Sequence, residues 1–225
     1  MVVYNAKYLI IKKNSIMIWY HYFSLAALLV CIIVMLIRFI HLIKMGNPKD
    51  LSQKKGNIFQ SEVYSYTIAM MPNKKESAYL HIFSFTAGVL FHIATLLSFV
   101  LFVLFFFIAP QAMLWNIRWI LSLIILIGAF SGFALFIKRM LVKKMRNLSN
   151  LDDYLSNFLT TFFQMCTILY LLLGNVVAPL YYIVLGILCL YMPIGKLKHV
   201  LYFFAARYHL GFFYGWRGSW PPKKY

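Results

Sequence analysis

Long apolar runs separated by short basic segments dominate this chain. Charged side chains are absent from Asn14–Ile37 and from the still longer run Ser77–Ile117. Trp119–Ile137 is a further charge-free run between Arg118 and Lys138. Since a helix of about 20 apolar residues crosses the hydrocarbon core of a bilayer, these runs predict membrane-spanning helices.

The last apolar run is too long for a single crossing. Tyr154–Gly195 contains no charged side chain. One helix over this whole run, roughly 42 residues, would extend about 63 Å, about twice the hydrocarbon thickness. The run must therefore fold back, and Gly174-Asn175 is the predicted turn.

These runs together predict the fold class. We predict an all-α membrane protein, a five-transmembrane-helix bundle forming a single integral membrane domain over 1–225. The predicted spans are 16–40, 83–108, 117–138, 154–173 and 176–201.

The basic residues orient these spans. Of the 22 Lys and Arg, 18 lie in the segments 38–75, 138–146 and 196–224, which five spans would place on the same side. Because positively charged loops stay in the cytoplasm, we predict the N-terminus outside and the C-terminus inside. Cytoplasmic loops are then expected at 41–82 and 139–153, with a cytoplasmic tail at 202–225.

Composition supports a membrane protein over a nucleic-acid-binding one. The chain is 63% hydrophobic and 12% charged, whereas soluble domains carry about 25% charged residues. The net charge of +17 could indicate nucleic acid, but the bases cluster at the ends of apolar runs, as expected next to a lipid bilayer. No nucleic-acid partner is expected.

Few side chains offer chemistry at membrane depth. Cys31, Cys166 and Cys189 lie within apolar runs and include no C-x-x-C pair, so we expect packing groups rather than an iron–sulfur site. The acids all lie outside the predicted spans, which argues against a proton-coupled carrier. These acids are Asp50, Glu62, Glu76, Asp152 and Asp153.

Two histidines remain as the strongest functional candidates. His92 lies within the apolar run 83–108, and His199 follows the last run. An imidazole at membrane depth needs a partner, and two of them on different helices suggest a shared metal centre, most often haem iron. Thr95, or a tyrosine on another span, could instead satisfy His92 by a hydrogen bond.

The other four histidines are interpreted as polar residues at the membrane boundary. His81 lies eleven positions before His92, which would place both on one helix face about 16 Å apart. Whether a second metal site uses any of the four is left open. They are His21, His41, His81 and His209.

The residues around the two histidines resemble a known family. Phe91-His92 in the second span and Pro193-x-x-Lys196-Leu197-x-His199 at the end of the fifth resemble the gamma (cytochrome b) subunit of respiratory nitrate reductase. They are also similar to the related membrane subunits of sulfite-reduction and heterodisulfide-reductase-like complexes. The resemblance extends from about Tyr64 to the C-terminus, and five spans with the N-terminus outside agree with it.

The resemblance implies one haem b with His92 and His199 as axial ligands on the cytoplasmic side. Lys196 and Arg207 are weaker candidates for contacts with the haem propionates. The nitrate reductase subunit has a second haem, whose ligand positions correspond to Phe102 and Tyr181 here. Phenylalanine cannot ligate iron, so we expect a single haem. Ala94 is another departure, since the family pattern has glycine there.

The implied function is a subunit of a quinone-linked oxidoreductase complex rather than an enzyme alone. Such a subunit passes electrons between menaquinone or ubiquinone in the bilayer and a cytoplasmic iron–sulfur partner subunit. The location implied is the cytoplasmic (inner) membrane of a bacterium or archaeon. The alternative from another class is a haem-free structural anchor of a larger complex, which would have the same topology.

Overall fold

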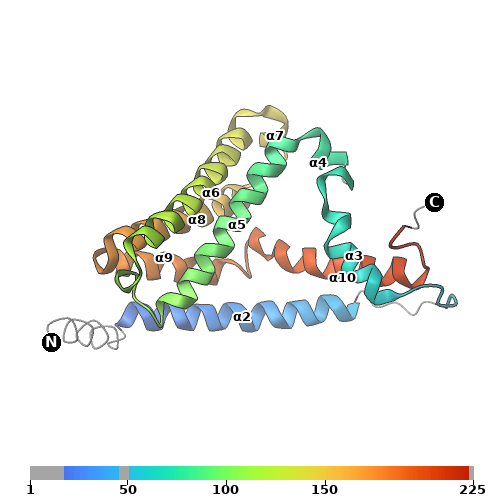
Figure 1. Ribbon diagram of the computed structural model, residues 1–225, viewed down its shortest axis with the longest axis horizontal. Helices are drawn as coiled ribbons and strands as arrows, with labels where there is room; N and C mark the ends of the chain where they lie inside the picture. Colours follow the sequence, from blue (N-terminus) through green and yellow to red (C-terminus); the bar gives the residue numbers. More distant parts are fainter. Residues whose placement is uncertain (1–17, 46–50, 75, 223–225) are drawn as a thin grey trace. The chain divides into compact units, whose positions relative to one another are not determined.

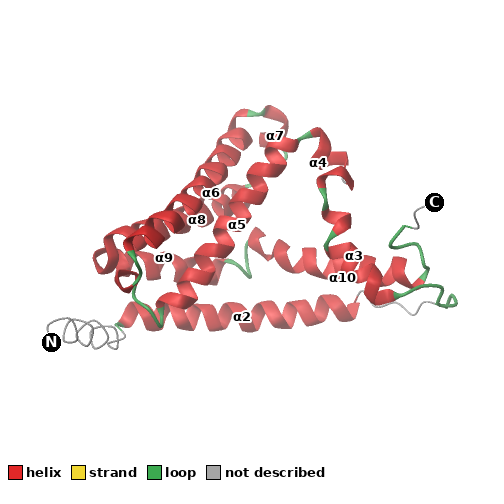
Figure 2. Ribbon diagram, in the orientation of Figure 1, coloured by secondary structure: helices red, strands yellow, loops and turns green. Residues whose placement is uncertain are grey.

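The computed structural model describes residues 18–45, 51–74 and 76–222. All regular elements within this part of the chain are helices (Figure 2). The predicted start of the first span at 16–17, Asp50, and the N-terminal lysines used for the orientation lie outside the described residues.

Four stretches of the described chain are long and apolar enough to cross a membrane. They are α2 (Trp19–Met45), α5 (Ile82–Phe105), α6 (Trp115–Leu141) and the interval Leu151–Tyr191, labelled in Figure 1. The last interval comprises α8 (Leu151–Leu173), the short 3-10 helix η4 (Gly174–Val177) and α9 (Ala178–Tyr191). The protein is therefore an all-α protein with membrane-spanning character.

The chain turns at the predicted Gly174-Asn175 position. Gly174 has a φ of +67°, which a glycine adopts without strain. Beyond it α9 runs back along α8: the rings of Tyr170 and Tyr181 stack at 4.7 Å near the turn. At the far end of the pair the hydroxyls of Ser156 and Tyr191 are 2.9 Å apart. The two helices are therefore antiparallel.

The predicted last span, 176–201, is not one continuous helix. α9 ends at Tyr191, and η5 (Lys196–Lys198) and α10 (His199–Trp216) follow a turn. Pro193 ends α9 because its ring lacks an N–H and clashes with the preceding turn. Most of the described part of the predicted cytoplasmic tail, 202–225, belongs to α10.

The chain forms two compact units. Within its described part, the first contains residues 18–31 and 84–196, and the second contains residues 32–83 and 197–222, so that α2 contributes to both. The remaining helices are all short: α3 (Ile58–Tyr66), η1 (Ile68–Met70), η2 (Pro72–Lys74), α4 (Glu76–Leu80), η3 (Pro110–Ala112) and α7 (Lys143–Asn147).

Small residues bring α5, α6 and α8 together in the first unit, and α6 and α8 run side by side (Figure 1). Gly128 and Gly132 form a Gly-x-x-x-Gly pair on α6, the pattern that lets membrane helices approach closely. A Cβ on Gly128 would overlap the Cβ of Ala94 and lie 3.1 Å from the Leu90 carbonyl oxygen. A Cβ on Gly132 would lie 2.8 Å from the Thr161 hydroxyl.

Gly128→Leu should therefore destabilise the first unit strongly. A leucine there forces α5 and α6 apart, and overpacking of this kind costs about 3 kcal/mol. Ala134→Leu is the matched control on α6 itself, because Ala134 is exposed and a larger side chain there has room. Thermal unfolding in detergent should show a clear loss of stability for Gly128→Leu only; equal midpoints for the two variants would contradict the packing.

In the second unit, α3 and α10 pack through small residues. Gly211 and Gly215 face α3, where a Cβ on Gly215 would lie 2.7 Å from the Ser61 Cβ. The Ser65 hydroxyl donates a hydrogen bond of 2.9 Å to the Arg207 carbonyl. Burial in this interface raises the pKa of the Glu62 carboxyl above its usual range.

Candidate functional site

The imidazole of His92 is oriented by a backbone carbonyl of its own helix. His92 lies on α5 with its side chain exposed, and its Nδ1 is 2.7 Å from the Gly88 carbonyl oxygen one turn earlier. A carbonyl only accepts, so Nδ1 is the donor in this bond, and the neutral tautomer that makes it has its lone pair on Nε2. Metal-bound histidines are commonly oriented by such a bond to a backbone carbonyl.

The helix surface beside this imidazole is open. Gly88 is one turn before His92 on the same face, and a Cβ there would meet no other atom within 4 Å. A flat aromatic macrocycle could approach the backbone at this point. The bond to the Gly88 carbonyl and the open space at that glycine are compatible with a haem ligand at His92.

Thr95 is engaged elsewhere. Its hydroxyl donates to the Phe91 carbonyl at 2.7 Å and accepts from Gln164 Nε2, also at 2.7 Å. His92 instead contacts the Gly88 carbonyl one turn earlier on α5. The suggested hydrogen bond between Thr95 and the imidazole is therefore not the one that forms.

Gln164 is a residue that the sequence analysis missed. It is fully buried on α8, and its Nε2 also donates to the Phe91 carbonyl at 3.1 Å. Its Oε1 has no hydrogen-bond partner among the described residues. Gln164 thus ties α8 to the turn of α5 that precedes His92. An amide midway along a charge-free run was the available signal, since polar groups at membrane depth are costly.

His199 is the first residue of α10, and its side chain is exposed. It belongs to the second unit, whereas His92 belongs to the first. The structure therefore does not join the two histidines into one described site, and each is characterised within its own unit.

The two candidate propionate-binding residues have different surroundings. Lys196 donates to Asp153 Oδ1, which also accepts from Arg139 at 2.8 Å. Asp153 is buried in the first turn of α8, so this cluster joins the start of α8 to the end of α6. Arg207, in the second unit, places its guanidinium 5.7 Å from the centre of the Phe203 ring.

Aromatic rings fill the positions at which the resemblance would place a second pair of haem ligands. Phe102 and Tyr181 are both fully buried. The Phe102 ring lies 6.2 Å from that of Tyr182, which in turn lies 5.1 Å from Tyr181. This end of the first unit is a packed aromatic core.

Three of the remaining histidines lie apart from His92 in the chain. His21 Nδ1 accepts from the Ile18 backbone N–H at 3.2 Å, and His209 Nε2 lies 3.3 Å from the Leu42 carbonyl. His81 is exposed in the turn before α5. Within the described residues, no group of three or more His, Cys, Asp or Glu side chains could hold a metal ion.

Comparisons with protein-family models, with curated proteins and with solved structures found no match for this chain. The fold defines the class as an all-α membrane protein. Any more specific function rests on the residues described above.

Proposed function

We propose that this protein is the b-type cytochrome membrane subunit of a quinone-linked redox complex. It passes electrons between menaquinone or ubiquinone and a cytoplasmic iron–sulfur partner through one haem b. His92 and His199 are the proposed axial ligands. The proposed location is a bacterial or archaeal cytoplasmic membrane.

The observation that carries this proposal is the 2.7 Å contact between His92 Nδ1 and the Gly88 carbonyl. It supports a ligand role because it fixes the tautomer in which Nε2 is the basic nitrogen, on a helix face that Gly88 leaves open. Gln164 supports the same turn from α8 through its bond to the Phe91 carbonyl.

The topology proposed with this function has five spans. α8 and α9 count as two crossings because α9 folds back along α8. The 14 residues of α9 extend only about 21 Å, so this last crossing would occupy a locally thinned or shielded part of the bilayer. The lysine and arginine distribution supports placing the N-terminus outside.

The cysteines bear on where the iron–sulfur clusters of the proposed complex would lie. Cys31, Cys166 and Cys189 are buried and free, and the sequence has no others, so the proposal assigns the iron–sulfur clusters to another subunit. Haem, when bound, supplies one-electron transfer between a two-electron quinone and such clusters. The protein's own residues hold and orient the group and keep it from water.

Quinol reduction of the purified full-length chain tests this function. A short-chain menaquinol or ubiquinol analogue should produce the absorption bands of reduced b-type haem. Subsequent reduction with dithionite should reveal no other type of haem in the spectrum. A protein without visible absorption would instead be the haem-free structural anchor. A haem that dithionite reduces but both quinols leave oxidised would contradict the link to quinone.

A further inference from the structure

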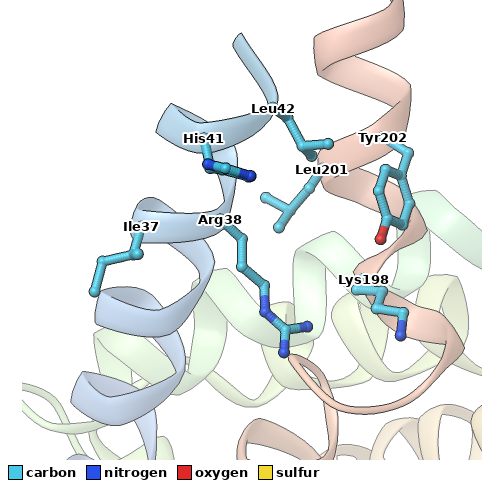
Figure 3. Close-up of a pocket in the computed structure, with 7 residues that line it drawn as sticks. All are labelled: Ile37, Arg38, His41, Leu42, Lys198, Leu201 and Tyr202. Carbon is cyan, nitrogen blue, oxygen red and sulfur yellow. The ribbon is translucent and has the colours of Figure 1, made fainter. Parts of the chain in front are cut away.

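A cavity of about 400 Å³ lies within the second unit, between the C-terminal half of α2 and the start of α10 (Figure 3). The hydrogen-bond contact of 3.3 Å between His209 and the Leu42 carbonyl holds these two helix segments together. Seven residues line the cavity: Ile37, Arg38, His41, Leu42, Lys198, Leu201 and Tyr202.

The lining combines positive charge with apolar surface. Arg38 and Lys198 are cations, His41 and Tyr202 add further hydrogen-bonding groups, and none of the seven lining residues is acidic. Figure 3 shows the side chains of Arg38 and Lys198 extending toward the same end of the gap between the helices, with the Tyr202 hydroxyl on that side. An anion is the ligand that this set of donors favours.

The helix geometry strengthens the preference for an anion. Lys198 is the N-cap residue of α10, and the start of a helix carries partial positive charge on its unbonded N–H groups. Arg38 and His41 are three positions apart on α2, and Lys198 and Tyr202 are four positions apart at the start of α10. Both spacings place the side chains on one helix face.

The position of the cavity indicates that the anion belongs to a lipid. Arg38 lies seven positions before the end of α2, a helix long enough to cross the bilayer, which corresponds to about 10 Å along the helix axis. The charged groups thus lie near the depth of lipid headgroups, and the apolar side chains of Ile37, Leu42 and Leu201 provide a surface for acyl chains.

We infer that this cavity is a binding site for the phosphate headgroup of an anionic phospholipid. Arg38 and Lys198 bind the phosphate, the Tyr202 hydroxyl donates to it, and the aliphatic lining holds the upper part of an acyl chain. Basic pockets between membrane helices are known to select anionic headgroups in this way. None of the seven lining residues is a proposed haem ligand.

Lipid retention measured by native mass spectrometry tests the inference. The full-length protein is purified in mild detergent and titrated with phosphatidylglycerol or with phosphatidylcholine. We expect one tightly held phosphatidylglycerol per chain. Arg38→Gln with Lys198→Gln should weaken it about 25-fold, since each removed basic residue corresponds to about fivefold. The matched control, Lys143→Gln with Lys144→Gln on the exposed helix α7, should leave retention unchanged.

Several outcomes would overturn the site. One is equal retention of the two lipids by the unmodified protein. Another is phosphatidylglycerol binding by the Arg38/Lys198 double variant that is as tight as that of the unmodified protein. Inorganic phosphate binding as tightly as phosphatidylglycerol in lipid-free detergent would assign the cavity to free phosphate. Loss of haem together with unchanged lipid retention in the double variant would assign it to the haem propionates. If the double variant does not fold, Arg38→Lys with Lys198→Arg, which keeps both charges, must retain the lipid for the inference to stand.

Discussion

His92→Ala should yield a folded protein that has lost its b-type haem. Alanine offers no lone pair to iron, and a haem held by one remaining axial histidine would be released or become high-spin. The side chain of His92 is exposed, and its contact with the Gly88 carbonyl stays within its own helix turn. Because this side chain is exposed, its removal takes little buried surface from the protein, and the fold itself should persist.

The matched control is His81→Ala, a histidine exposed in the turn that precedes the same helix. Reduced-minus-oxidised spectra should show the full haem signal for His81→Ala and none of the low-spin signal for His92→Ala, with unchanged helicity in both. A low-spin haem spectrum in His92→Ala that matches the unmodified protein would refute the ligand assignment. His199→Ala should behave like His92→Ala.

Arg118→Leu should be the most destabilising change in the first unit. Arg118 is buried on α6, and its guanidinium donates to two carbonyls in the last turn of α8, those of Leu171 at 2.5 Å and Leu172 at 2.8 Å. Hydrogen bonds from a charged donor contribute about 1.5–3 kcal/mol each. Leucine would remove both bonds and leave the end of α8 without this donor, a loss of about 3 kcal/mol or more.

The buried cysteines provide a direct assay for this effect. Cys166 and Cys189 are buried on α8 and α9, so a thiol-reactive fluorophore labels them only when the first unit opens on heating. Arg118→Leu should lower the labelling midpoint by several degrees, and Arg118→Lys by less, because one ammonium keeps the charge without the two-pronged geometry. Arg146→Leu on the exposed helix α7 should leave the midpoint in place. An unchanged midpoint for Arg118→Leu would mean that the two carbonyl bonds do not hold α8 to α6.

The long apolar helices could be predicted because their signal is local. Charge-free runs and their flanking bases place α2, α5, α6 and α8 within a few residues of the observed bounds. The need for a turn follows from length, since the bilayer cannot accommodate a straight helix over the whole of 154–195, and Gly174-Asn175 marks its position. The end of α9 at Tyr191 was missed, although Pro193 marked it, because the apolar composition continues past the proline.

Contacts between distant segments could not be predicted in the same way. Arg118 was assigned only as a cation at the end of a span, because its carbonyl partners lie on α8, far along the chain. The segment that forms α10 was predicted partly as the end of the last span and partly as a cytoplasmic tail. The need for glycine at positions 211 and 215 is visible only once α3 packs against them. The role of Gln164 likewise depends on its hydrogen bond to Thr95 on a different helix.

The histidines illustrate both sides of this limit. Sequence alone selected His92 as an imidazole that needs a partner, and the structure supplied the Gly88 carbonyl that orients it. Pairing with His199 remains a proposal, because it depends on how two units of the chain are arranged around a shared group.

The ratio of haem b to polypeptide in the purified protein tests the central proposal most directly. A pyridine haemochrome assay combined with amino-acid analysis gives this ratio without any assumption about partners. One haem b per chain is the predicted result. A chain that binds no haem when produced with an ample haem supply would contradict the cytochrome proposal, and two haems per chain would contradict the assignment of a single site to His92 and His199.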